Sequence, residues 1–351
     1  MNLRERLIAA IAERGPMSVA DYMAACLYDA DGGYYTTCPR LGADGDFITA
    51  PHISQMFGEL LGLWAAEVWD RLGRPRRARL VELGPGDGTM MTDILRAARA
   101  VPGFLAACEV WLMETSAPLR ALQEAAMVST PIRWAENLAA APTDAPLIVL
   151  ANEFLDCLPI DQAVLTAEGW MERRVGVDEE GGLAFRLAGL ASPGVGPLGA
   201  VLEWSDDLAA FGQTVGEVLG RAGGAALFAD YGRDAPGYGD TLQAVRGHRK
   251  ESPLAHPGEA DLTAHVDFPA FLAAARQSGV RAAPIRSQGD FLRALGIETR
   301  AAALAGARPD RAQAIGRQLA RLTAPDQMGE LFKAACIHSP GLVPPGFEAA
   351  P

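Results

Sequence analysis

A short glycine-rich stretch has the residue types of a nucleotide-cofactor turn. The segment VELGPGDGTM (81–90) places Gly84, Gly86 and Gly88 between a short apolar run and a helical pattern. Gly84 permits a sharp turn, Gly86 lets a ligand approach the backbone, and Gly88 lets the helix begin with its free N–H groups toward that ligand. The spacing therefore predicts a cofactor site where the strand 78–83 ends.

An acidic residue follows the next predicted strand along the chain. Glu114 ends the apolar run 108–114. A carboxylate in this place of a nucleotide-binding fold accepts hydrogen bonds from the ribose hydroxyls of an adenosine. The turn, the acid and the strand–helix alternation together favour an adenosine cofactor over a tight turn with a surface glutamate.

The order of the glycines discriminates between cofactors. A nicotinamide site has the pattern G-x-G-x-x-G, whereas here the third glycine comes one residue earlier and Glu82 stands two residues before the first. The charge of Asp87 also opposes a pyrophosphate. The pattern is similar to the E-x-G-x-G-x-G of class I S-adenosylmethionine methyltransferases, which predicts that cofactor; a nicotinamide-dependent oxidoreductase is the less favoured alternative.

Polar side chains come directly after another apolar run. The strand 146–151 leads into NEFLDCLP (152–159), which carries Asn152, Glu153 and Asp156. The carboxyl end of a central parallel strand faces the ligand crevice. Two neighbouring acids there could clamp a guanidinium with charge-assisted hydrogen bonds; a helix N-cap with ordinary surface acids is the alternative.

Three of the five histidines lie between residues 248 and 268. Their spacing fits no standard metal-binding pattern, so no metal site is predicted. His265 is the candidate for the group that takes up a proton after methyl transfer, with Asp267 as the alternative. The three proposed catalytic residues are therefore Glu153, Asp156 and His265.

Strands and helices alternate through the middle of the chain, which predicts an α/β fold with a parallel sheet covered on both faces. We expect an N-terminal helical segment (1–75), a Rossmann-like core (76–245) with a β-rich insertion near 155–210, and a C-terminal segment (246–351) that completes the core. The expected helices are 2–14, 18–27, 53–72, 89–101, 117–126, 206–221, 268–278, 289–295, 299–306 and 310–322. The expected strands are 78–83, 108–114, 131–134, 146–151, 225–230 and 332–337, with shorter β pieces at 160–166, 169–177 and 183–188.

Composition restricts the classes of function. The chain has 351 residues and a net charge of −12, which disfavours nucleic acid as a general partner. No run approaches the roughly 18 apolar residues of a membrane span. The N-terminal segment has acidic residues within a short amphipathic repeat, unlike a signal or transit peptide, so a cytoplasmic location is expected.

The chain resembles the MidA family of S-adenosylmethionine-dependent methyltransferases, whose mitochondrial members are protein arginine methyltransferases for complex I assembly. One departure from the family pattern is His52, where the resemblance leads us to expect Glu. The segments that carry the resemblance are GGYY (32–35), GADGDFITAPHISQMFGELLG (42–62), VELGPGDGTM (81–90), ANEFLDCLPI (151–160), ADYG (229–232), DLTAHVDF (261–268), FLRALGIETR (291–300) and MGELFK (328–333).

The resemblance implies a class I methyltransferase sheet with elaborations and S-adenosylmethionine bound at the glycine turn. It implies that Asn152 and Glu153 lie beside the transferred methyl group. The predicted cofactor contacts are Glu82, Gly84, Pro85, Gly86, Glu114, Glu136, Asn137 and Asn152.

We therefore expect methyl transfer to arginine nitrogens of a protein, with a respiratory complex I subunit as the candidate substrate and a homodimer as a possible assembly. A non-catalytic assembly factor that keeps the cofactor site is the alternative. Tyr34 and Tyr35 could close over the cofactor or belong to a core.

Overall fold

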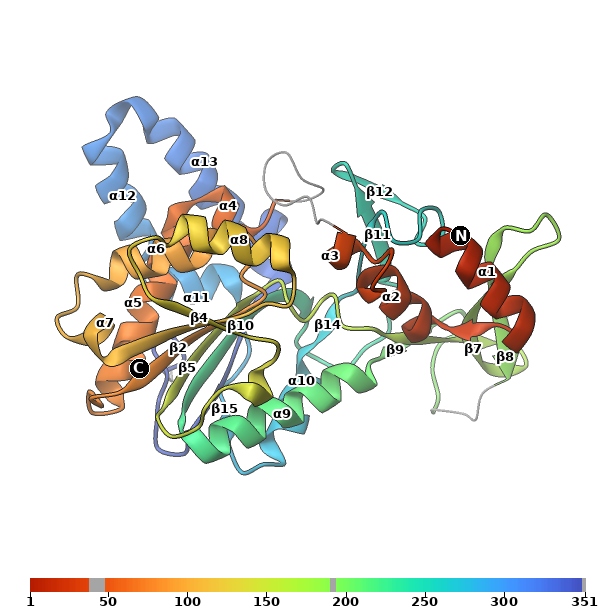
Figure 1. Ribbon diagram of the computed structural model, residues 1–351, viewed down its shortest axis with the longest axis horizontal. Helices are drawn as coiled ribbons and strands as arrows, with labels where there is room; N and C mark the ends of the chain where they lie inside the picture. The colour runs from red at the N-terminus through yellow and green to blue at the C-terminus, as the bar shows by residue number, and fades with distance from the viewer. Residues whose placement is uncertain (38–47, 190–193, 349–351) are drawn as a thin grey trace. The chain divides into compact units, whose positions relative to one another are not determined.

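The chain folds into two compact units, each assembled from three segments (Figure 1). A computed structural model describes residues 1–37, 48–189 and 194–348. The first unit consists of Met1–Phe47, Leu155–Ala209 and Ala235–Asp267, and the second of Ile48–Phe154, Ala210–Asp234 and Phe268–Pro351. In this division the helix of residues 55–71 belongs to the second unit, whereas the sequence pattern places it in the expected N-terminal segment (1–75).

The second unit contains the predicted sheet. Its strand order is β15-β17-β10-β5-β2-β3-β4, and the neighbours from β10 to β4 are parallel. The strand β17 is antiparallel to β10, and β15 and β16 pair with β17. The strands are β2 (Ala78–Leu83), β3 (Cys108–Met113), β4 (Ile132–Ala135), β5 (Leu147–Asn152), β10 (Gly224–Arg233), β15 (Arg281–Ala282), β16 (Arg286–Ser287) and β17 (Phe332–His338).

Helices cover both faces of this sheet, as its apolar strands predicted (Figure 1). On one face, Leu80 and Leu227 share a core with α5 and α6. On the other face, the ring of Phe228 contacts Phe211 of α9 and Phe271 of α10. The helices are α4 (Ala50–Ile53), α5 (Gln55–Arg71), α6 (Thr89–Ala98), α7 (Phe104–Ala107), α8 (Ala117–Ala126), α9 (Asp206–Ala222), α10 (Phe268–Arg276), α11 (Gln288–Ala294), α12 (Ile297–Ala307) and α13 (Ala312–Thr323).

The helices α5 and α6 approach each other closely because α5 carries glycine where they cross. A Cβ atom on Gly62 would lie 2.5 Å from the carbonyl oxygen of Ile94, and one on Gly58 would lie 2.6 Å from the Cβ of Asp93. Only glycine fits such an approach without moving a helix. The crossing matters for the site because α6 begins directly after the glycine turn.

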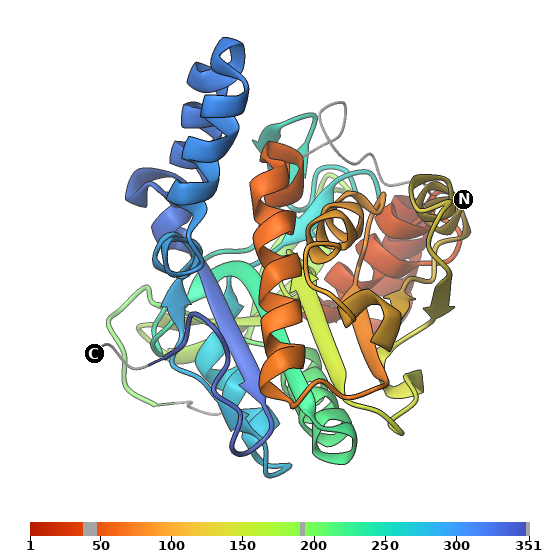
Figure 2. The same ribbon diagram turned by 90° about the vertical axis from the view of Figure 1, so that its left-hand side faces the viewer.

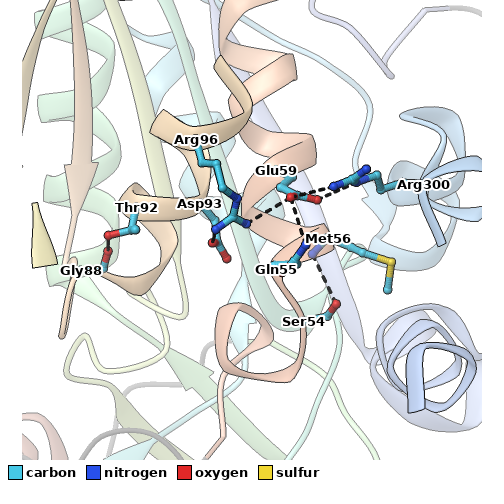
Figure 3. A network of polar contacts seen from close by, with 9 residues as sticks. All are labelled: Ser54, Gln55, Met56, Glu59, Gly88, Thr92, Asp93, Arg96 and Arg300. Atoms are coloured by element: carbon cyan, nitrogen blue, oxygen red, sulfur yellow. Dashed lines mark hydrogen bonds and ion pairs between the residues drawn. The ribbon is translucent and has the colours of Figure 1, made fainter. Parts of the chain in front are cut away.

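A buried carboxylate adds polar contacts to the same helices (Figure 3). Glu59 of α5 accepts two hydrogen bonds from Arg300 of α12, at 2.8 and 2.9 Å, and one from Arg96 of α6 at 3.1 Å. Burial acts to raise the pKa of Glu59, but the two guanidinium groups lower it on balance. The ion pairs thus connect α12, the first helix of the hairpin α12–α13 seen in Figure 2, to the helices that cover the sheet.

The first unit is built from helices and two smaller sheets. The first sheet has the order β1-β7-β6-β9, with β8 also paired to β7, and the second has the order β12-β11-β13. The strands β6, β7 and β8 occupy the three short β pieces expected within 155–210. The elements are α1 (Leu3–Arg14), β1 (Met17–Ser18), α2 (Val19–Tyr28), α3 (Tyr34–Thr37), β6 (Asp161–Thr166), β7 (Gly169–Val177), β8 (Leu183–Gly189), β9 (Val201–Trp204), β11 (Gln243–Arg246), β12 (Arg249–Glu251) and β13 (Asp261–Thr263). The two-residue strand β14 (Val266–Asp267) belongs to neither of these two sheets.

Two further expectations from the sequence concern the segment that begins at residue 42 and the absence of a membrane span. Residues 42–47 of the segment GADGDFITAP lie outside the described residues. Within the described ranges, no helix is both long enough and apolar enough to cross a membrane.

Candidate functional site

The order of strands in the second unit reverses once, and this reversal marks where a ligand is expected to bind. The chain runs outward from β2 through β3 to β4, and then returns to place β5 on the other side of β2. Ligands of open α/β sheets bind at such a reversal, outside the carboxyl ends of the strands. The glycine turn follows β2 and Asn152 ends β5, so the predicted residues flank this reversal.

The glycine turn has a backbone that suits glycine at all three positions. Gly84, Gly86 and Gly88 have φ values of 60°, 55° and 85°, in the left-handed region that other residues rarely adopt. The N–H of Gly88 donates to the carbonyl of Pro85 at 2.8 Å, which closes the turn just before α6 begins. Pro85 itself is buried. The turn therefore has the tight shape that the sequence predicted.

Two buried oxygen atoms near the turn have no hydrogen-bond partner among the described residues. They are Oε2 of Glu82 on β2 and Oδ1 of Asn152 on the neighbouring strand β5. Burial, with a smaller contribution from Asp87, raises the pKa of Glu82 well above its usual value. Buried acceptors without partners are costly unless a ligand supplies donors. They suit a ligand that carries an amino group or a positive charge.

The carboxylate of Glu114 is held at the end of β3. Its Oε1 accepts hydrogen bonds from the backbone N–H groups of Thr115 and Ser116, at 2.9 and 2.8 Å. Burial raises the pKa of Glu114, although the two backbone donors act in the opposite direction. The side chain of Gln123 also donates to this carboxylate, and sequence reasoning missed that residue.

Two further predicted cofactor contacts follow β4. Glu136 and Asn137 are both exposed, and they come directly after the last strand of the parallel set. Oδ1 of Asn137 accepts a hydrogen bond from the N–H of Ala140 at 3.1 Å. Asn137 thus has a local structural role as the N-cap of a short 3₁₀ helix, and its role toward a cofactor stays a prediction.

His52 forms an ion pair with the glycine turn. Its Nε2 lies 3.0 Å from Oδ2 of Asp87, and its Nδ1 lies 2.8 Å from the hydroxyl of Thr49. The bond to Asp87 raises the pKa of His52. Burial acts to raise the pKa of Asp87, but the bonds from His52 and Thr89 lower it to about 2. The negative charge of Asp87 therefore has a partner, which the position of His52 in the sequence did not indicate.

This ion pair predicts a pH-dependent stability. Replacing His52 with Gln is expected to lower the free energy of unfolding by about 1 kcal/mol near pH 6, and by less near pH 8. Because the folded pKa of His52 is raised, its stabilisation is complete below the unfolded value of about 6.5 and is lost as the pH rises through the folded value. Asp87 stays ionised throughout this range, since its pKa is about 2.

Urea unfolding at the two pH values measures this effect. His256→Gln is the matched control, because His256 pairs with Glu251 at the surface, where ion pairs contribute little. An equal loss of stability at both pH values would contradict the contribution of a charged His52.

Glu153 combines an unusual backbone with a fixed carboxylate. Its φ of 48° is a left-handed value for a residue with a side chain, and such strain is common at functional sites. Oε1 accepts hydrogen bonds from the N–H of Ala50 at 3.1 Å and from Nδ2 of Asn152 at 3.0 Å. The structure thus brings Glu153, Asn152 and the start of α4 together at the end of β5.

The other two predicted catalytic residues belong to the first unit. Asp156 is buried, and its backbone carbonyl accepts a hydrogen bond from the N–H of Ala264 at 2.9 Å. The N–H of His265, the next residue, donates to the hydroxyl of Thr241 at 2.9 Å. Asp156 and His265 therefore lie on adjoining segments of one unit, whereas Glu153 lies in the other unit. Asp267 ends β14.

The paired tyrosines belong to the core of the first unit. Tyr34 is buried in its apolar cluster, and Tyr35 packs against that cluster. The hydroxyl of Tyr35 donates to Oδ1 of Asp261 at 2.9 Å. Burial raises the pKa of Tyr35, and the negative charges of Asp261 and Asp156 add to this effect. Of the two alternatives for these tyrosines, the contacts favour the core.

The hydrogen-bond acceptors at the ends of β2, β3 and β5 fit S-adenosylmethionine. Buried acceptors on Glu82 and Asn152 suit the amino group and positive charge of this cofactor, and a fixed carboxylate on Glu114 suits ribose hydroxyls. Among the described residues, no group of three His, Cys, Asp or Glu side chains could hold a metal ion.

Comparisons with known proteins agree with this fit. The model of a family described as S-adenosyl-L-methionine-dependent methyltransferases matches residues 60–285. The chain is 34% identical to the mitochondrial protein arginine methyltransferase NDUFAF7 of Bos taurus over 93% of this chain and 81% of that protein. It is 35% identical to the protein of the same name from Mus musculus, over 93% and 82% of the two chains.

A solved structure is similar over nearly the whole chain. A protein from Burkholderia thailandensis bound to S-adenosyl-homocysteine has a TM-score of 0.84 and 29% identity, and the match covers 99% of this chain and 93% of that one. The predicted class I methyltransferase fold and the predicted cofactor are thereby confirmed. The chain belongs to this family of S-adenosylmethionine-dependent methyltransferases.

Proposed function

We propose that the protein transfers the methyl group of S-adenosylmethionine to an arginine nitrogen of a protein substrate. The observation that carries this proposal is the Glu153 carboxylate, which Ala50 and Asn152 hold at the end of β5 beside the glycine-turn strand. The relatives from Bos taurus and Mus musculus, which are named protein arginine methyltransferases, support the same acceptor.

The chemistry requires a group that orients the acceptor. When bound, S-adenosylmethionine supplies a methyl group on a positively charged sulfur. A guanidinium is a weak nucleophile because its lone pairs are delocalised and it stays charged. A carboxylate that binds two of its N–H groups localises the charge and aligns the remaining nitrogen for in-line attack.

We assign this orienting role to Glu153, with Asp156 as the second carboxylate. The methyl group would pass from the sulfur to the attacking nitrogen, so that a C–N bond would replace the C–S bond and the electron pair of the C–S bond would stay on sulfur. The attacking nitrogen then releases one proton, which His265 takes up in our proposal. The proposed cofactor contacts are Glu82, Gly84, Pro85, Gly86, Glu114, Glu136, Asn137 and Asn152.

Amino-acid analysis after labelling tests the acceptor. The purified protein is incubated with S-adenosylmethionine carrying a labelled methyl group and with protein extract from cells that lack this chain. The expected result is label in methylated arginine after acid hydrolysis of the protein fraction. Label confined to another residue type or to small molecules would overturn the arginine assignment.

Replacing Glu153 with Gln is expected to lower the turnover of a confirmed arginine substrate about tenfold or more, because a neutral amide no longer localises the guanidinium charge. The affinity for S-adenosylhomocysteine should change much less. Steady-state rates and calorimetric titration measure the two effects. Full turnover in a folded Glu153→Gln protein would exclude the orienting role.

Three finer expectations also belong to this proposal. A subunit of respiratory complex I is the candidate substrate, on the basis of the family resemblance. A cytoplasmic location and a homodimer are expected as well. Methylation of a purified complex I subunit at one arginine would identify the substrate, and sedimentation of the purified protein would test the dimer.

A further inference from the structure

The side chain of Gln123 forms hydrogen bonds with three residues at or beside the predicted cofactor site. This residue lies on α8 and is 0% exposed. Its Nε2 donates to the carbonyl oxygen of Gly86 at 2.8 Å and to Oε2 of Glu114 at 3.3 Å. Its Oε1 accepts a hydrogen bond from Nε1 of Trp134 on β4 at 2.8 Å. One amide therefore connects residues at the carboxyl ends of β2 and β3 with a side chain of β4.

The contact with Trp134 determines which way the amide faces. An indole N–H can only donate, so the amide oxygen must lie toward Trp134. The NH₂ group must then lie toward Gly86 and Glu114, whose oxygens are both acceptors. The reverse orientation would place a donor against a donor and an acceptor against two acceptors. The amide thus has a single orientation in which every hydrogen bond is satisfied.

Packing places α8 directly against the glycine turn as well. A Cβ atom on Gly88 would lie 3.1 Å from Cε of Met127 and 3.4 Å from Cα of Gln123. The backbone donors at Thr115 and Ser116 already hold Oε1 of Glu114, so the contact from Gln123 fixes the other carboxylate oxygen. Both oxygens of Glu114 are thereby oriented before a ligand arrives.

We infer that Gln123 is a positioning residue for the cofactor, which acts mainly by holding the carboxylate of Glu114 in its ligand-binding arrangement and in addition supports the turn at Gly86. This inference rests on the proposed cofactor contacts of those two residues. A site that already has its binding arrangement binds a ligand more tightly than one that must rearrange first. Loss of the amide should therefore weaken cofactor binding even though Gln123 need not touch the cofactor.

Calorimetric titration with S-adenosylhomocysteine tests this role in the full-length protein. Gln123→Met keeps the volume of the side chain but removes the two N–H groups that bind Gly86 and Glu114. The dissociation constant of this variant for S-adenosylhomocysteine is expected to rise about tenfold. Gln123→Glu places a carboxylate oxygen against both acceptors and should weaken binding further. Trp134→Phe removes the N–H that orients the amide, together with part of the ring that packs against the core, but leaves Gln123 in place. It should weaken binding about threefold.

A buried glutamine outside the site provides the control. Gln288 is 1% exposed and donates from Nε2 to the carbonyl of Leu322 at 3.0 Å. Gln288→Met should lower the thermal stability of the protein but leave its affinity for S-adenosylhomocysteine within about twofold of the original. A general loss of packing would therefore be distinguished from a loss of site geometry.

A double-mutant cycle with Glu114 separates positioning from a merely structural role. If Gln123 acts mainly through Glu114, then Gln123→Met should change the affinity less than about threefold in a Glu114→Ala background, instead of about tenfold. A structural role would give losses that multiply independently. Independent losses, or unchanged binding in a folded Gln123→Met protein, would overturn the inference while leaving the cofactor assignment intact. Absence of binding by the unmodified protein would overturn both.

Discussion

Replacing Gly86 with Val is expected to weaken the binding of S-adenosylhomocysteine by about 100-fold or more. Gly86 has a φ of 55°, which a β-branched residue does not adopt without strain. The turn must therefore change shape, and its carbonyl then leaves the 2.8 Å contact with Gln123. The added side chain also occupies the space through which a ligand approaches the backbone. Calorimetric titration of the purified variant measures the loss.

Gly181→Val is the matched control for this prediction. Gly181 also has a positive φ, of 82°, but it lies between β7 and β8 in the other unit, and a Cβ atom there would meet nothing within 4 Å. The same backbone strain should therefore reduce stability without changing the affinity for S-adenosylhomocysteine. Normal binding by a folded Gly86→Val protein would show that the turn does not hold the cofactor.

The second large effect is expected at the crossing of α5 and α6. Gly62→Ala should lower the free energy of unfolding by about 2 kcal/mol, because overpacking in a tight contact costs about 1–3 kcal/mol. The new Cβ atom would lie 2.5 Å from the carbonyl oxygen of Ile94, and its three nearest neighbours are all backbone atoms of Ile94, so no flexible side chain can move aside. Chemical denaturation measures the change.

The same substitution on another helix should have the opposite sign. A Cβ atom on Gly316, within α13, would meet nothing within 4 Å. Gly316→Ala is therefore expected to raise the free energy of unfolding by about 0.5–1 kcal/mol, because alanine loses less backbone entropy in a helix. Equal effects of the two substitutions would contradict the close helix crossing.

The sequence predicted the central sheet well because its strands are short apolar runs between clear helical patterns. The strands β2, β3 and β5 lie within one residue of their expected ends. Periodicity did not reveal that α5 belongs with this sheet, since a helix pattern shows an apolar face but not its partner. The small sheet β12-β11-β13 was also missed, because its strands have only three or four residues.

The site could be predicted where a backbone shape requires a particular residue, and not where distant residues meet. The three glycines were recognised because positive φ values restrict the residue type. The contacts of His52 with Asp87 and of Gln123 with Gly86 join residues far apart in the sequence, and one sequence carries no sign of such pairs. The family resemblance could not indicate the contact between His52 and Asp87 either, because the resemblance predicts a glutamate at position 52.

A crystal structure of the protein with S-adenosylhomocysteine tests the cofactor site most directly. We predict that the ribose hydroxyls lie within hydrogen-bond distance of the Glu114 carboxylate. We also predict that the amino group lies near Glu82 or Asn152, and that Gln123 keeps its bonds to Gly86 and Trp134. A ligand bound away from the ends of β2 and β3, with Glu114 making no contact to it, would contradict the assignment of the site.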